Sequence, residues 1–174
     1  MSTKRQPRRD RGEFASWIFG LVITLVVATV GTAAATTFME IPGLPGESSD
    51  DNHRDWIVLT AYTQSVGLKP CLKAIVMKNL DRASPGLATF AAANTKIPLV
   101  TIHIEKEAAG RGIRFFEALL EQVVIDEVAI IDDFQSGSSV TEKVVLLPKR
   151  VTISYFPESA SGQPLPAVIG TLSC

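Results

Sequence analysis

The sequence has few of the residues that enzymes use most often for catalysis or metal binding. Its 174 residues include only two cysteines and two histidines. No two histidines stand four positions apart and no two cysteines stand two apart, as zinc motifs require. A Gly-x-Ser-x-Gly elbow and a phosphate-binding loop are also missing. We therefore predict a protein that is not an enzyme and that holds no metal and no cofactor.

The chain also lacks a large excess of charge of one sign. It carries 17 basic and 18 acidic residues, and five of the basic residues lie in the first eleven positions. Two of the acidic residues precede residue 36, so the remainder is mildly acidic, with 12 basic and 16 acidic groups. Because nucleic-acid binding needs clustered lysines and arginines, we expect no nucleic-acid partner.

The N-terminal segment has the three-part order of a secretory signal peptide. A basic stretch over residues 1–13 precedes an almost continuous apolar run from Phe14 to Val30, which small residues up to Ala35 follow. This order predicts cleavage after Ala35 and export to the periplasm or the medium. The alternative is an inner-membrane anchor over residues 14–35, since a bilayer span takes about 20 apolar residues. No other membrane contact is expected.

Export changes how the two cysteines are interpreted, because thiols can pair in an oxidising compartment. The sequence offers one intramolecular pair, Cys71 with Cys174, which would hold the extreme C-terminus in place. Two separate thiols, or pairing of Cys174 between subunits, are the alternatives.

Alternation of apolar and polar residues predicts strands along most of residues 36–174. The clearest strand begins at Ile97, and its polar face carries His103 and Glu105, which we expect to be solvated. Strand-forming residues also fill the ranges 36–41, 56–66, 72–77, 140–147, 151–155 and 167–172. The folded part is therefore predicted to be mainly β.

One short helix is predicted in the middle of the chain. Ser84 can cap its first amide groups, with Asp81 in the same cap, and Pro85 suits the first helical position because it has no N–H. The helix is expected to run to Ala93 and to end at Asn94, which can adopt a positive φ.

The segment from Arg114 to Ile131 is ambiguous. Apolar residues over 114–122 are spaced as on an amphipathic helix, whereas the second half is rich in β-branched residues. Periodicity alone would predict a helix for the first half.

Carboxylates gather around one of the two histidines. Asp50, Asp51 and Asp55 flank His53 in a stretch of turn-forming residues. Such a composition favours a solvated polar loop. A metal-assisted active site on these four residues is a weaker hypothesis.

Several short motifs, taken in order, resemble the Hcp family, the tube proteins of type VI secretion systems. Residues 38–48 resemble its opening strand and loop, Leu80 to Leu87 its helix start, and Thr141 to Tyr155 its closing hairpin. The resemblance extends over residues 37–172.

This resemblance implies a small closed antiparallel β-barrel with one short side helix, and a strand for the ambiguous segment. In the family, six copies form a ring, and stacked rings carry effectors. The resemblance therefore implies a homo-oligomer, namely a hexamer, with secretion-apparatus or effector proteins as further partners. Apolar residues on outward strand faces would contact the next subunit. The candidates for this interface are Ile57, Leu59, Phe115 and Val145.

Two features differ from the family. Its members are usually made without a signal peptide, and they carry a long glycine-rich extension where this chain has only Val66 to Leu72. The leading prediction is an exported, self-assembling ring protein without enzymatic activity. The alternative is a monomeric exported binding module on the same barrel.

Overall fold

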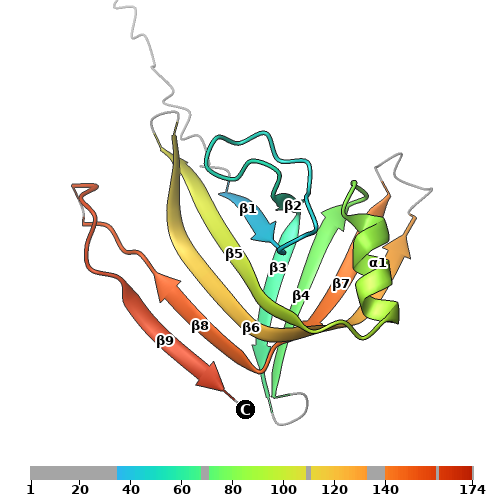
Figure 1. The fold of residues 1–174 in the computed structure, drawn as a ribbon. Coiled ribbons are helices and arrows are strands. Elements are labelled where there is room, and N and C mark those ends of the chain that lie inside the picture. Colours follow the sequence, from blue (N-terminus) through green and yellow to red (C-terminus); the bar gives the residue numbers. More distant parts are fainter. Residues whose placement is uncertain (1–34, 68–70, 109–110, 133–139, 160, 174) are drawn as a thin grey trace, which may run out of the picture. The chain divides into compact units, whose positions relative to one another are not determined.

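The computed structural model describes residues 35–67, 71–108, 111–132, 140–159 and 161–173 (Figure 1). Residues 1–34, which hold nearly all of the predicted leader, and Cys174, which completes the predicted disulfide, lie outside these ranges. Within them, no helix has the length and apolar character needed to span a membrane. The elements in chain order are β1 (Ala35–Glu40), β2 (Ile57–Leu59), β3 (Ala61–Val66), β4 (Leu72–Asn79), α1 (Ser84–Ala92), β5 (Ile97–Ala108), β6 (Arg111–Ile131), β7 (Thr141–Leu147), β8 (Arg150–Tyr155) and β9 (Val168–Ser173).

Every strand pair is antiparallel, and one long path connects seven of the strands in the order β2-β1-β5-β6-β7-β4-β3. β8 pairs with β6 and β9, so these two strands continue the sheet off this path. The two ends of the path, β2 and β3, are separated only by Thr60, whose amide donates to the Met77 carbonyl at 2.8 Å. The predicted mainly β, antiparallel fold with one short helix is confirmed.

β6 is a 21-residue strand that pairs with three other strands. Its first half pairs with β5 and β8, and its second half pairs with β7. Near the division between the halves, Gln122 has a φ of 52°. The register of the β6–β7 ladder then shifts between Ile125 and Glu127. Such irregularities bend a strand and increase its local twist, so one strand can serve ladders that run in different directions.

The strand interpretation of residues 114–131, which the family resemblance implied, is therefore confirmed. The helical spacing over residues 114–122 is misleading because this part of β6 is covered to some extent on both faces. Ala118 and Leu120 are fully buried in the core, while Phe115, Phe116, Glu117 and Leu119 are half-buried. A strand covered on both sides does not show clean alternation.

Three of the four residues predicted for an outward interface lie inside the protein. Ile57 and Leu59 belong to the core cluster, and Val145 is only 4% exposed. Phe115 is half-buried. The prediction was wrong for Ile57 and Leu59 because the phase of the three-residue strand β2 is set by its partner. Ile57 pairs with Met39 of β1, which is fully buried, and so turns inward with it.

One lysine is completely buried at the end of the core. Lys78 on β4 and Glu142 on β7 face each other in the ladder, on the same side as core residues Val76 and Val144. The Lys78 ammonium lies 2.9 Å from Glu142 Oε2 and 2.8 Å from Asp81 Oδ1. It also donates to the Asn79 carbonyl and to the Ser84 hydroxyl, each at 2.9 Å. The charges thus join β4 and β7 to the start of α1.

This ion pair explains why Ser84 does not cap the helix. Ala83 is the N-cap residue, and no side chain caps the first amide groups. The Ser84 hydroxyl instead accepts from Lys78 and donates to Glu142 Oε2 at 2.9 Å, so the predicted cap at Ser84 was wrong. Asp81 does satisfy one amide, that of Ala83, at 2.9 Å.

The other predicted features of the helix, at Pro85 and Asn94, agree with the structure. Pro85 lies in the first turn, where its missing N–H has no consequence. Asn94 has a φ of 50°, and the Thr95 amide donates back to the Phe90 carbonyl at 2.9 Å. This is the Schellman arrangement that a residue with positive φ makes possible.

Replacing Lys78 with methionine should destabilise the protein by about 3–5 kcal/mol, because Glu142 would remain buried without its counter-ion. Urea unfolding followed by circular dichroism measures this free energy. A Lys78→Met/Glu142→Leu double variant should recover part of the loss. The matched control is Lys143→Met, whose partly exposed pair with Glu127 should be worth about 0–1 kcal/mol. Equal effects of the two single variants would contradict this account.

Candidate functional site

The loop between β1 and β2, residues 41–56, folds back over the outward face of β1, β5 and β6 (Figure 1). The strand register brings Phe38 of β1 next to His103 of β5, and His103 next to Glu117 of β6. His53 of the loop lies on top of this row and is only 2% exposed. The site is therefore formed by one loop and three strands.

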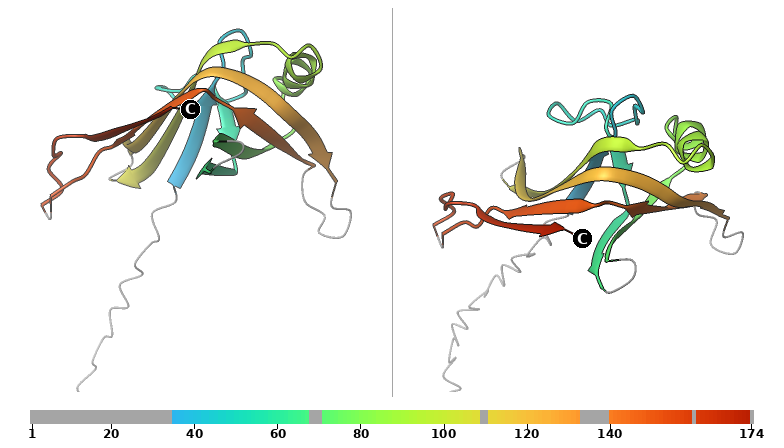
Figure 2. Two further views of the ribbon diagram at one scale, coloured as in Figure 1. Left: turned by 90° about the horizontal axis from the view of Figure 1, so that it is seen from below. Right: turned by 60° about the horizontal axis from the view of Figure 1, so that its bottom comes forward.

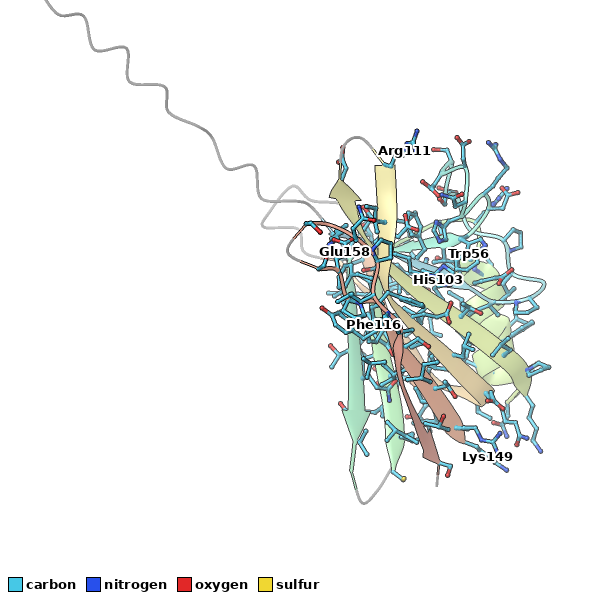
Figure 3. The ribbon with its side chains drawn as sticks, turned by 90° about the vertical axis from the view of Figure 1, so that its left-hand side faces the viewer. Trp56, His103, Arg111, Phe116, Lys149 and Glu158 are labelled. Carbon is cyan, nitrogen blue, oxygen red and sulfur yellow. The ribbon has the colours of Figure 1, made fainter. Side chains whose placement is uncertain are left out.

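Aromatic rings enclose the His53 imidazole. The Phe38 ring stacks on it with 4.2 Å between centroids and an interplanar angle of 2°. Trp56 meets it edge-on at 4.8 Å. The Trp56 ring also lies 4.8 Å from the His103 ring, and Figure 3 labels these two side chains. The predictions of a solvated loop residue at His53 and a solvated surface residue at His103 were thus wrong, since the loop covers both rings.

The two histidines belong to a continuous chain of polar contacts, called here the histidine chain. It consists of Asp50, His53, His103, Arg114 and Glu117. Asp50 Oδ1 lies 2.9 Å from His53 Nδ1, and His53 Nε2 lies 2.8 Å from His103 Nδ1. At the other end, Arg114 Nη1 lies 3.0 Å from His103 Nε2 and 2.8 Å from Glu117 Oε2. His103 Nε2 and Glu117 Oε2 are 3.0 Å apart.

The surroundings favour a neutral His103 and an ionised Asp50. Burial lowers the pKa of His103 below its ordinary value, and the charges of Arg114 and His53 lower it further, against the opposing effect of Glu117. The hydrogen bond from His53 holds the pKa of Asp50 below its ordinary value, against desolvation. The contacts are then satisfied when Arg114 donates to His103, His103 to His53, and His53 to Asp50.

A second carboxylate approaches His53 from β5. Glu105 is 7% exposed, and its Oε1 lies 3.7 Å from His53 Nε2. One ligand atom from each of Asp50, His53 and Glu105 can be chosen so that all three lie within 4.8 Å of one another. Among the described residues, this is the group whose geometry could hold a metal ion.

The other two acids of the weaker active-site hypothesis lie elsewhere. Asp51 is almost fully exposed and faces Arg54 at 3.4 Å. Asp55 forms an ion pair with Arg82, which precedes the helix. The four-residue site was therefore wrong in its membership: the structure joins Asp50 and His53 to a glutamate about 50 residues away, which local sequence spacing does not indicate.

The comparisons with known proteins agree with this fold. The family model described as "Type VI secretion system effector, Hcp" matches residues 38–155. The chain belongs to the Hcp family. No curated protein matches its sequence.

Solved structures of Hcp proteins share the fold. Hcp1 from Salmonella typhimurium superimposes with a TM-score of 0.70 at 21% identity, covering 80% of this chain and 94% of that chain. A type VI secretion system effector from Yersinia pestis gives a TM-score of 0.67 at 21% identity, with 79% and 99% covered. A type six secretion system protein gives 0.72 at 21% identity, with 80% and 96% covered.

In this Hcp-family chain, the loop is held at its base by Arg82. The Arg82 guanidinium donates to the Gly46 carbonyl and to Asp55, and its backbone amide donates to Glu47 Oε1 at 3.1 Å. The Gly46 backbone lies directly against the next turn, because a Cβ added there would lie 2.3 Å from the Trp56 carbonyl oxygen. Close packing of backbone on backbone thus requires glycine at this position.

Gly46→Ala should therefore displace the loop and lower the melting temperature, because backbone atoms of Trp56 and Ile57 cannot move aside cheaply. Hydrogen exchange should show loss of protection at the amides of residues 46–56. Gly170→Ala on β9 is the control, since an added Cβ there meets nothing within 4 Å. Unchanged exchange in Gly46→Ala would show that the loop does not depend on this contact.

Proposed function

We propose that this protein is an exported, self-assembling structural protein of the type VI secretion tube kind, without enzymatic activity. Membership of the Hcp family supports the assembly part of this proposal. The single observation that carries it is an uncovered apolar surface on β8 and β9, at the edge of the sheet.

We also propose that the sheet closes into a small barrel. The ends of the strand path, β2 and β3, are consecutive in the chain with only Thr60 between them. The Thr60 amide extends the β3–β4 ladder by its hydrogen bond to the Met77 carbonyl. Core residues of β2 and β4, such as Leu59 and Val76, belong to one cluster, as the interior of a small barrel requires.

β8 and β9 form a two-stranded arm beside this path (Figure 2). β9 pairs with β8 on one side only, and its other edge is open among the described residues. Val168 and Ile169 are 64% and 65% exposed, and Tyr155, opposite Val168 in the ladder, is 50% exposed. An open edge with exposed apolar side chains is an aggregation hazard unless something covers it.

A second copy of the chain fits this surface best. Its position at one end of the sheet suits a head-to-tail contact, which generates rings when the rotation between subunits closes. The residues that carry the interface in this proposal are Tyr155, Val168 and Ile169, in place of the buried residues first predicted. The hexameric ring that the family resemblance implies is a specific form of this proposal.

The alternative is a monomeric exported binding module that uses the same arm for another protein. The short connection from Val66 to Leu72 favours it, because the long extension of other family members is missing there. Oligomeric state separates the two functions.

Light scattering with size-exclusion chromatography should give a mass several times that of the protomer at high protein concentration. Val168→Asp should shift the protein to monomer, because the charge would be desolvated at the contact. Leu80→Asp is the matched control, since Leu80 is 42% exposed but lies beside α1, outside the arm. A strict monomer for the unaltered protein would favour the binding module.

We propose that residues 1–35 direct export and are removed. Intact mass of protein recovered from the periplasm should correspond to a chain that begins at Thr36, whereas full-length chain in the membrane fraction would indicate the anchor. If Cys71 and Cys174 pair, as we further propose, the denatured exported protein should take up thiol-alkylating reagent only after reduction.

A further inference from the structure

The Glu105 carboxylate is buried at the loop site without a close cationic partner among the described residues. Arg114 lies opposite it in the ladder, but its guanidinium contacts Glu117 and stands over the Phe156 ring at 5.0 Å. The contact of Glu105 with His53 Nε2 spans 3.7 Å, beyond hydrogen-bond distance. Glu105 is 7% exposed and borders a hollow that is open to solvent, where a positive charge next to its carboxylate would be stabilising.

The surroundings of this carboxylate leave room for a ligand. A Cβ added at Gly112 would lie 2.1 Å from Glu105 Oε2, so on that side the carboxylate packs against the glycine backbone. A hollow of about 190 Å³ reaches both Asp50 and Glu105 from the surface. Of the basic side chains along it, Lys106 is held by Glu158 at 2.6 Å, and Arg111 lies exposed at the strand end.

We propose that this site binds one divalent transition-metal cation of the zinc class through His53 Nδ1 and carboxylate oxygens of Asp50 and Glu105. One ligand atom from each residue falls within the 4.8 Å group. The 2.9 Å between Asp50 Oδ1 and His53 Nδ1 matches two ligand atoms that are each about 2.0–2.2 Å from a shared ion. Two carboxylates balance the charge of the dication, and the hollow leaves a coordination position for water.

The histidine chain already supplies the outer partners that such a ligand needs. With the metal on Nδ1, His53 donates its Nε2–H to His103 Nδ1 at 2.8 Å, and His103 donates its Nε2–H to Glu117 at 3.0 Å. Arg114 then gives up its hydrogen bond to His103 Nε2 and keeps the one to Glu117 Oε2 at 2.8 Å. Compared with the metal-free arrangement, His53 and His103 each carry their ring proton on Nε2 in place of Nδ1, so no proton is gained or lost. A carboxylate at the end of such a chain fixes the tautomer and orientation of a metal-binding imidazole.

The ligand set also selects the class of metal. One imidazole nitrogen with two carboxylates suits Zn²⁺ and its transition-metal neighbours, whereas Ca²⁺ and Mg²⁺ prefer sites made of oxygen alone. Stacking of Phe38 on the imidazole holds the ring in one orientation, whereas Glu105, whose Oε1 lies 3.7 Å from Nε2, has to turn toward Nδ1 on binding.

Isothermal titration of EDTA-dialysed protein with Zn²⁺ tests this proposal. We expect one ion per chain, a rise in melting temperature, and a Co²⁺-substituted protein with visible absorption bands that excess Ca²⁺ does not remove. Glu105→Gln should weaken Zn²⁺ binding by at least about tenfold, as loss of a ligand implies. Because glutamine keeps the shape of the glutamate side chain, metal-free Glu105→Gln should melt at or above the temperature of the metal-free parent.

Asp51→Asn is the matched control. Its carboxylate neighbours Asp50 in sequence but is almost fully exposed and lies outside the metal group, so binding should not change. Absence of one-to-one Zn²⁺ binding by the unaltered protein would overturn the proposal. So would equal affinity of Glu105→Gln and Asp51→Asn for Zn²⁺, or displacement of Co²⁺ by Ca²⁺. None of these results depends on whether the protein assembles.

Discussion

Burial of the Lys78 ammonium is the constraint on which the arrangement of this protein depends. A fully buried charge must keep its partners, and here they come from β4, β7 and the turn before α1. A shift of one residue in the β4 register would turn Lys78 outward and Met77 inward, which fixes the pairing with Glu142. The same contact sets where the helix begins. Arg82, next to Asp81, is thereby positioned to hold the base of the β1–β2 loop.

The loop held in this way gives the sheet two very different surfaces. Over β1, β5 and β6 it covers the outward face, so that Phe38, His53 and His103 form a small second core with aromatic contacts. The β8–β9 arm has no such cover among the described residues, and Val168 and Ile169 remain in solvent. The contrast between a face that the chain covers itself and an edge that it leaves open is the physical argument for placing a partner on the arm.

Sequence reasoning could reach the parts of this structure that local pattern determines. Alternation located β5, and Asn94 marked the end of the helix. It failed where a distant segment decides the outcome: His53 and His103 are 50 residues apart, and only the folded loop brings their rings together. The inward phase of Ile57 is likewise set by its pairing with Met39. For Lys78 an indication was available, because it follows Leu72, Ala74 and Val76 at intervals of two and therefore shares their inward face.

A row of two histidines between carboxylates resembles an acid–base relay, but its geometry favours a different role. A general base must reach a proton on its substrate directly or through one water. Here each ring nitrogen already has a protein partner, and Phe38 and Trp56 close off the His53 ring. The accessible atoms of the site are the carboxylates of Asp50 and Glu105, which border the hollow. Carboxylates at the open end and imidazoles at the closed end fit the proposed cation site, in which His53 is a ligand and His103 orients its ring.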